Sequence, residues 1–301
     1  MKKYPLDKSL KSMEHFKPPF KSFIFFFAKL FMPSVNFLLK RKKINFKRIS
    51  LSTDGKAFNT YVIYQNDLKK KSGALIYLHG GGFAFKANSS QINNFLETLN
   101  KTNLIGVLID YSVAKEHPLP NKQVSKAFNY LLENSANFNI DKNNIFLSGD
   151  SAGGFLALDL LEWFKYPFAG LLLLFPVVDQ KMNTESMRLF VDTPVWNAKS
   201  NKKMWKKYSG GKRIKSILDS ENLKYFPPTF IEVCEFDCLR DEGLALFNKL
   251  DKEGIDVTLN YVHGATHGYD TISKGDLSKE SQKKRIDFII NHINENYDNL
   301  D

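Results

Sequence analysis

The feature that most constrains the fold of this chain is a serine enclosed by glycines, with a strand-like run before it and a helix-like run after it. The motif Gly149-Asp150-Ser151-Ala152-Gly153-Gly154 lies between the apolar residues 144–148 and 155–161. Glycines allow a turn too sharp for other residues, and a strand, a sharp turn and a helix in succession expose a serine hydroxyl. Because Gly-x-Ser-x-Gly also occurs by chance, the flanking elements carry the argument. They predict that Ser151 is a nucleophile.

A second glycine run, His79-Gly80-Gly81-Gly82-Phe83, follows the strand-like residues 74–78. Glycine-rich turns also bind phosphate, but this run lacks the Lys and Ser/Thr of a P-loop and the spacing of a dinucleotide fingerprint. Backbone amides near a nucleophilic serine stabilise the negative oxygen of a tetrahedral intermediate. We therefore expect the N–H groups of Gly81, Gly82 and Ala152 to form an oxyanion hole, and the histidine of the run to brace its own loop.

The acid that completes the site is predicted from its place at a strand end. Catalytic residues of open α/β sheets lie at the carboxyl ends of strands. Where the serine stands on a strand-turn-helix elbow, the acid and then the histidine follow it in the chain. Asp237 directly follows the strand-like residues 229–236. Asp241 and Glu242 fall in the first turn of the next helix, where the helix dipole favours negative charge. Asp237 is therefore the expected partner of the catalytic histidine.

Two histidines follow the alternating residues 256–262, and we expect the second to act as the base. His267 lies between Gly264 and Gly268, in a stretch flexible enough to reach back over the sheet. His263 adjoins the strand end, which is typical of a surface or structural histidine.

These motifs, in this order, make the chain resemble the hormone-sensitive-lipase-like branch of the α/β-hydrolases, which includes many microbial carboxylesterases. The resemblance covers roughly residues 72–295. It implies a mostly parallel sheet flanked by helices, with a helical cap over the site. It also implies a serine hydrolase that cleaves short to medium acyl esters through an acyl-enzyme, with no cofactor or metal. One departure is Cys238, which stands where the family usually has a proline after the acid.

Other activities use the same set of residues. A lipase acting on membrane-associated lipid esters and a deacetylase or amidase both stay open, because the motifs identify the nucleophile and not the leaving group. Some receptors for small molecules in this family keep the pocket and lack the catalytic histidine. The presence of Ser151, Asp237 and His267 argues against such a receptor.

Strand-like and helix-like runs alternate from about residue 74 onward, which predicts an α/β domain over residues 46–301. Two antiparallel strands are expected at its start, near 46–52 and 58–65. A segment at about 180–215, rich in Trp and Tyr, is expected to be inserted as part of the cap. The two cysteines, Cys234 and Cys238, have no metal-ligand set around them in the sequence, so we expect reduced thiols and a cytoplasmic protein.

The net charge of +11 arises in residues 1–50, which hold 13 Lys or Arg and 2 Asp or Glu. A nucleic-acid surface should be basic in the folded domain as well, so no nucleic-acid partner is expected. The apolar residues 23–39 include Lys29 and Pro33 and fall short of the ~20 residues that a membrane-spanning helix needs. No small-residue cleavage site follows them, which argues against a signal peptide.

Residues 1–45 therefore have two interpretations, which do not exclude each other. In the first they form part of the cap, and Phe27 contacts the substrate together with Phe83. In the second they form an interfacial helix, with possible peripheral contact to an anionic membrane. The resemblance also allows a homodimer formed by edge-to-edge pairing of the final strand.

Overall fold

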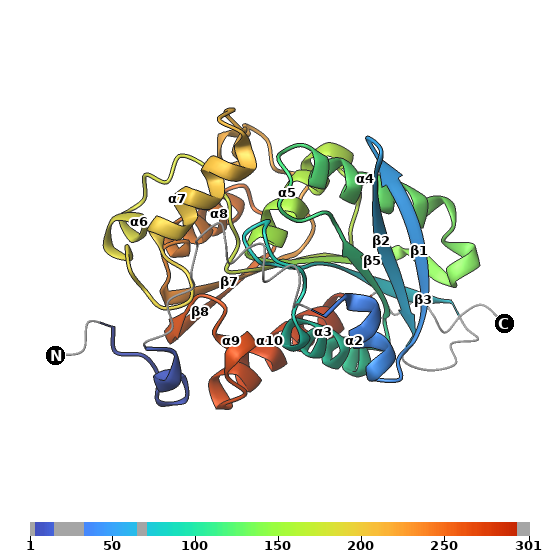
Figure 1. The fold of residues 1–301 in the computed structure, drawn as a ribbon, viewed down its shortest axis with the longest axis horizontal. Coiled ribbons are helices and arrows are strands. Elements are labelled where there is room, and N and C mark those ends of the chain that lie inside the picture. The colour runs from blue at the N-terminus through green and yellow to red at the C-terminus, as the bar shows by residue number, and fades with distance from the viewer. Residues whose placement is uncertain (1–3, 15–32, 65–70, 294–301) are drawn as a thin grey trace.

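An eight-stranded sheet runs through the centre of the computed structural model, which describes residues 4–14, 33–64 and 71–293 (Figure 1). The strand order is β1-β2-β4-β3-β5-β6-β7-β8. β2 is antiparallel to β1 and β4, and all other neighbours are parallel. The strands are β1 (Asn45–Thr53), β2 (Lys56–Tyr64), β3 (Ser72–Leu78), β4 (Ile105–Asp110), β5 (Ile140–Asp150), β6 (Gly170–Leu174), β7 (Thr229–Phe236) and β8 (Val257–Thr266).

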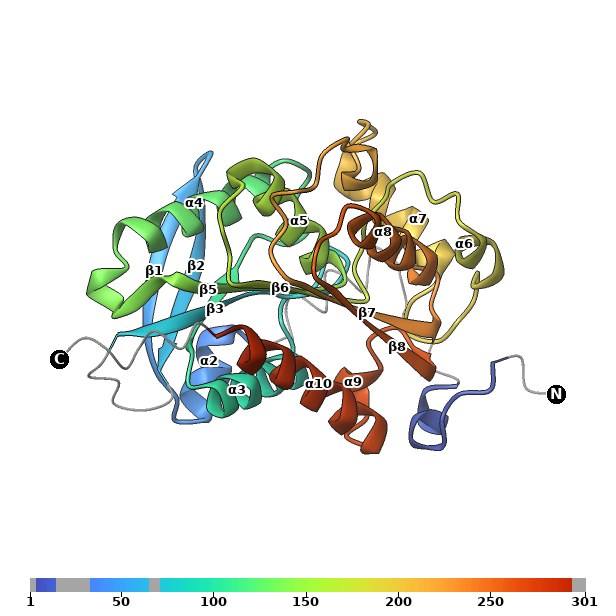
Figure 2. The ribbon, with the colours of Figure 1, turned by 180° about the vertical axis from the view of Figure 1, so that it is seen from behind.

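Helices cover both faces of the sheet, as Figures 1 and 2 show. One face carries α4 (Leu119–Glu133), α5 (Ala152–Phe164) and α8 (Arg240–Lys252). The other carries α2 (Val35–Arg41), α3 (Ser89–Thr102), α9 (Tyr269–Ile272) and α10 (Asp276–His292). The remaining elements are the 3₁₀ helices η1 (Lys8–Met13) and η2 (Ala136–Phe138), and the helices α6 (Glu185–Leu189), α7 (Ala198–Ser209) and η3 (Ile217–Asp219) between β6 and β7. The predicted α/β-hydrolase fold class is confirmed.

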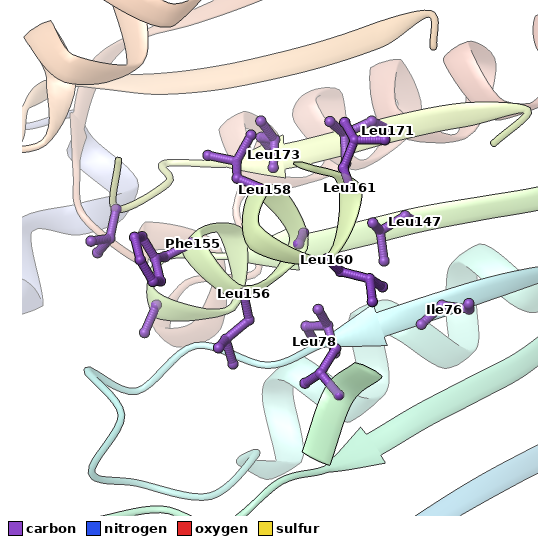
Figure 3. Packing of buried hydrophobic residues seen from close by; sticks show 14 of the residues in the cluster. Ile76, Leu78, Leu147, Phe155, Leu156, Leu158, Leu160, Leu161, Leu171 and Leu173 are labelled. Carbon is purple, nitrogen blue, oxygen red and sulfur yellow. The ribbon is translucent and has the colours of Figure 1, made fainter. Parts of the chain in front are cut away.

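The side chains of β3 alternate between two hydrophobic cores, which explains why this strand is apolar throughout. Ile76 and Leu78 belong to the core that includes α5, and Leu75 and Tyr77 belong to the core that includes α3. Successive side chains of a strand point to opposite faces, so a central strand with helices on both sides needs apolar residues at every position. Figure 3 shows Ile76 and Leu78 facing the leucines of α5.

The predicted pair of antiparallel strands is confirmed at β1 and β2. Asp54 and Gly55 connect them with φ angles of 49° and 70°. Two consecutive positive φ values are typical of the tight hairpin turn that matches the twist of the flanking strands.

β8 continues past its predicted end, through His263 to Thr266. It stays paired with β7 after a local irregularity in the register, and the Glu235 carboxylate accepts a 2.7 Å hydrogen bond from the Gly264 amide. The expectation of one flexible loop holding both histidines is therefore wrong, because His263 lies on the strand and only His267 follows it. β8 is an edge strand of the sheet, and dimerisation through it stays a prediction.

The described parts of residues 1–45 pack into the core on the α3 side of the sheet. Leu10 and Met13 of η1 and Leu39 of α2 are fully buried there. Phe27 lies outside the described residues, so its predicted contact with the substrate stays a prediction. No helix in residues 4–14, 33–64 or 71–293 combines the length and the apolar character that a membrane crossing requires.

The turn between β5 and α5 has no room for side chains at its glycines. A Cβ atom added at Gly153 would lie 1.9 Å from the carbonyl oxygen of Leu78, and one added at Gly149 would lie 2.3 Å from the carbonyl oxygen of Gly153. The first turn of α5 is therefore pressed directly against β3. This contact fixes the position of Ser151 relative to the carboxyl end of β3.

Gly153→Ala is expected to lower the free energy of unfolding by more than about 3 kcal/mol, because the new methyl group would overlap the Leu78 carbonyl. Helix propensity alone favours alanine by about 0.5–1 kcal/mol, so the two effects have opposite signs. The control is Gly211→Ala, where nothing lies within 4 Å of the added atom and only the cost of a left-handed backbone, about 1–2 kcal/mol, applies. Urea unfolding measures both, and equal losses would contradict this account.

Candidate active site

Ser151 is held in a backbone conformation that few residues other than glycine adopt. It has φ 54° and ψ −118°, and its side chain is buried. Its amide donates a 2.9 Å hydrogen bond to the carbonyl of Leu174, and its carbonyl accepts from the amides of Val177 and Gly154 at 3.0 Å. A left-handed conformation costs a residue other than glycine about 1–3 kcal/mol. The three hydrogen bonds offset this cost and hold Ser151 in the unfavourable conformation. The hydroxyl is thereby presented at the carboxyl end of β5.

The three residues predicted to form the charge relay meet at one point. The Ser151 Oγ lies 2.9 Å from Nε2 of His267, and Nδ1 of His267 lies 2.7 Å from Oδ2 of Asp237. The second Asp237 oxygen accepts a 3.0 Å hydrogen bond from the amide of Leu239. This bond holds the carboxylate in a local turn, so the site does not require a proline in place of Cys238. By contrast, the His263 side chain is 83% exposed.

The residues predicted to form the oxyanion hole lie beside Ser151. A Cβ atom added at Gly80 would lie 3.1 Å from the Cβ of Ser151, so the glycine run touches the serine. Gly81 and Gly82 have φ angles of 124° and 57°, which favour glycine. Within the part of the chain that the structure describes, the amides of Gly81, Gly82 and Ala152 donate to no protein acceptor. Three uncommitted amides are what an oxyanion hole needs.

The Asp150 carboxylate ties the glycine run to the turn, a role that was not predicted from the sequence. It accepts hydrogen bonds from the Gly80 amide at 2.9 Å, the Tyr77 hydroxyl at 2.7 Å and the Gln91 side chain at 2.7 Å. Burial raises the pKa of the Asp150 carboxyl, which its donors oppose. The signal was present in the sequence, because Asp150 directly precedes Ser151 inside the motif.

His79 braces its own loop, as expected. Its ring stacks on Tyr111 at 4.3 Å between centroids, and Nδ1 donates to the Gly80 carbonyl at 2.8 Å. The Tyr111 hydroxyl donates to the His79 carbonyl at 2.7 Å. Nε2 is buried and has no hydrogen-bond partner, and burial lowers the pKa of His79 to about 4. The ring is therefore a neutral structural element near neutral pH.

A buried group of charged residues fixes the segment that follows His267. Arg285 of α10 donates from Nε to the Glu232 carboxylate at 3.0 Å and from Nη1 to the Asp270 carboxylate at 2.6 Å. The Tyr269 hydroxyl also donates to Glu232, at 3.0 Å. Tyr269 and Asp270 come two and three residues after His267, so this group holds one end of its loop. In the sequence, the sign of this buried group is Glu232, a charged residue within the mostly apolar run 229–236.

Aromatic side chains of the β6–β7 segment cover the site from the other side. The Trp196 ring lies 5.9 Å from the His267 ring, and Tyr208 stacks on Phe83 at 3.6 Å with an interplanar angle of 6°. Phe83 is buried under this stack. The predicted contact of Phe83 with a substrate stays a prediction.

Comparison with known proteins places the chain in a family. A family model for the α/β-hydrolase fold matches residues 75–271. The chain belongs to this α/β-hydrolase family. The matched region contains Ser151, Asp237 and His267, and the predicted family resemblance is confirmed.

The individual relatives of this chain are named as α/β hydrolases, lipases or esterases. An α/β hydrolase of Acanthamoeba polyphaga mimivirus is 28% identical, with 79% of this chain and 72% of that protein covered. Lipase 2 of a Moraxella strain is 31% identical, with 68% of this chain and 57% of the lipase covered. The crystal structure of the esterase LipW from Mycobacterium marinum superposes with a TM-score of 0.85 at 19% identity and covers 96% of each chain, which concerns the fold alone.

His79→Phe is expected to weaken the loss of stability on acidification. The pKa of His79 is about 4 in the folded protein and about 6.5 when unfolded, so only the unfolded chain gains this proton between those values. Stability falls as the pH drops through this window, by about 2 kcal/mol at pH 5 from this group alone. Urea unfolding of both proteins at pH 7.5 and pH 5 measures the difference. An identical pH dependence in the two proteins would contradict a buried, neutral His79.

Proposed function

We propose that this protein is a serine carboxylesterase that hydrolyses esters with short to medium acyl chains. The observation that carries the proposal is the unbroken relay in which Ser151 Oγ, the His267 ring and the Asp237 carboxylate are joined at 2.9 and 2.7 Å. The esterase and lipase names of relatives support the same reaction class. All three side chains are buried, so bulk water competes little for these hydrogen bonds.

In the proposed mechanism Ser151 Oγ attacks the ester carbonyl carbon while its proton passes to Nε2 of His267. Asp237 accepts a hydrogen bond from Nδ1 and stabilises the imidazolium that forms. The carbonyl oxygen becomes an oxyanion, which accepts hydrogen bonds from the amides of Gly81, Gly82 and Ala152. His267 then gives its proton to the departing alcohol, which leaves an acyl group on Ser151. Water repeats the sequence and releases the acid.

The rigidity of the glycine run matters for this mechanism. Removing one oxyanion donor typically costs ~3–4 kcal/mol of transition-state stabilisation, and a backbone amide is effective only where it already points at the developing charge. Asp150 supplies that preorganisation by holding the Gly80 amide, and Tyr111 holds the His79 carbonyl. The loop therefore enters the reaction in its final geometry.

The segment between β6 and β7 acts as the cap in this proposal. Trp196 lies against His267, and Tyr208 lies over Phe83, so the segment limits the room beside the nucleophile. At the N-terminus, the Tyr4 hydroxyl donates a 2.6 Å hydrogen bond to Asp192 of the same segment. This contact favours the cap interpretation for the start of residues 1–45, while η1 and α2 pack on the α3 side of the sheet.

Ser151→Ala is expected to lower kcat/KM for 4-nitrophenyl butyrate by about 10³-fold or more, because no hydroxyl remains to form the acyl-enzyme. His267→Ala is expected to have a comparable effect. The matched control is His263→Ala, which removes an exposed histidine four residues away and should change kcat/KM less than about twofold. Release of 4-nitrophenolate measures the rates, and circular dichroism checks folding.

Two outcomes would overturn the proposed roles. Undiminished turnover by a folded Ser151→Ala protein would exclude Ser151 as the nucleophile. A loss of activity in His263→Ala equal to that in His267→Ala would show that the choice between the two histidines is wrong.

A further inference from the structure

A groove opens between the glycine run and α7, close to one of the proposed oxyanion donors. It has a volume of about 470 Å³ and includes Gly82, Phe83 and Ala84 on one side and residues of α7 on the other. Gly82 is both a wall of the groove and a proposed oxyanion donor, so the groove begins beside the place where the carbonyl of an ester would bind.

Hydrogen bonds and ring stacking make the groove a built feature of the fold. The Ala114 amide donates to the Phe83 carbonyl at 2.7 Å, and the His117 amide donates to the Tyr208 carbonyl at 2.7 Å. Phe83 and Tyr208, whose rings stack on each other, both line it. Three segments that are distant in the sequence are thereby fixed around one concave surface.

The rim of this groove is cationic. Four lysines line it, namely Lys115, Lys203, Lys206 and Lys207, and no Asp or Glu is among its lining residues. Lys115, Lys203 and Lys206 form no ion pair with any residue in the described part of the chain. Residues 193–218 contain eight Lys or Arg and no acidic residue, so compensating carboxylates come from other segments, as Glu162 does for Lys215. The nearest acid along the chain is Glu116, whose carboxylate lies against Gly210.

We infer that the groove binds a negatively charged arm of the substrate, so that the enzyme prefers esters bearing a carboxylate or similar anion over neutral esters of the same shape. A concave site lined by one sign of charge concentrates the field and raises the local concentration of a counter-charged ligand. Flexible ammonium groups suit such a ligand because each acts as a mobile point charge. The inference rests on the proposed function, since the groove matters for catalysis only if an ester binds at Ser151.

A flat anionic membrane is the less favoured occupant of these lysines. The cations surround a concavity whose wall is an oxyanion donor, whereas a lipid surface would be met by a convex or planar face. An anionic substrate arm and an anionic membrane are different classes of partner, and they are distinguished by ester selectivity and vesicle binding.

The test compares kcat/KM for matched esters. One pair carries the charge on the acyl arm (mono-4-nitrophenyl glutarate against 4-nitrophenyl pentanoate). The other carries it on the alcohol arm (4-acetoxybenzoate against its methyl ester). The charge-reversal variant is Lys203→Glu/Lys206→Glu. Its control is Lys199→Glu/Lys202→Glu, which changes the net charge equally at two exposed positions of the same helix that do not line the groove.

For at least one pair, the ratio of kcat/KM for the anionic ester to that for the neutral ester is expected to fall about tenfold in the groove variant and less than about threefold in the control. In the wild type the same ratio should fall when ionic strength rises from about 20 mM to about 0.5 M. Lys203→Gln/Lys206→Gln, a milder change, should give an intermediate ratio and serves if the glutamate variant does not fold.

An equal effect of the groove and control variants, or a ratio independent of salt, would overturn the inference while leaving ester hydrolysis intact. Sedimentation with phosphatidylserine vesicles that the groove variant loses, together with unchanged ester ratios, would assign the lysines to a lipid surface instead. If the wild type hydrolyses none of the four esters and no 4-nitrophenyl butyrate, the proposed function fails, and this inference fails with it.

Discussion

The contact between the start of α5 and the end of β3 is the constraint on which the rest of the site depends. Gly153 lies so close to the Leu78 carbonyl that no side chain fits between them, and Gly149 is similarly close to Gly153. Ser151 lies in the turn between these two glycines and has a positive φ of 54°. The same contact brings the glycine run, which begins directly after β3, to the serine. The proposed nucleophile and the proposed oxyanion donors are therefore positioned by the same packing contact.

The histidine reaches this point through support from both sides. On the side of α9 and α10, Arg285 bridges Glu232 and Asp270 and so connects β7, α9 and α10 next to the histidine loop. On the side of the β6–β7 segment, Trp196 packs near the His267 ring. Buried ion pairs contribute little net stability compared with apolar packing, but breaking one leaves an uncompensated charge. The group at Arg285 is therefore better understood as fixing a geometry than as adding stability.

The sequence predicted the strand-turn-helix around Ser151 because local rules of glycine and alternation determine it. It also indicated Asp237 and His267, since strand ends and chain order restrict the choice. It did not reveal that β8 continues through His263, because that extension depends on the carboxylate of Glu235 in the neighbouring strand. Beyond residue 50 the numbers of basic and acidic residues are equal, so the composition gives no sign of a cationic site. The local excess of lysine at the groove arises only when α7 folds over the glycine run.

The most direct test of the central claim is covalent labelling with a fluorophosphonate, which reacts with a serine that a neighbouring base has activated. The account predicts a single adduct, located by mass spectrometry on the peptide that contains Ser151, and its loss in His267→Ala. A protein that is folded and stays unlabelled, or that carries the adduct on another serine, would contradict it.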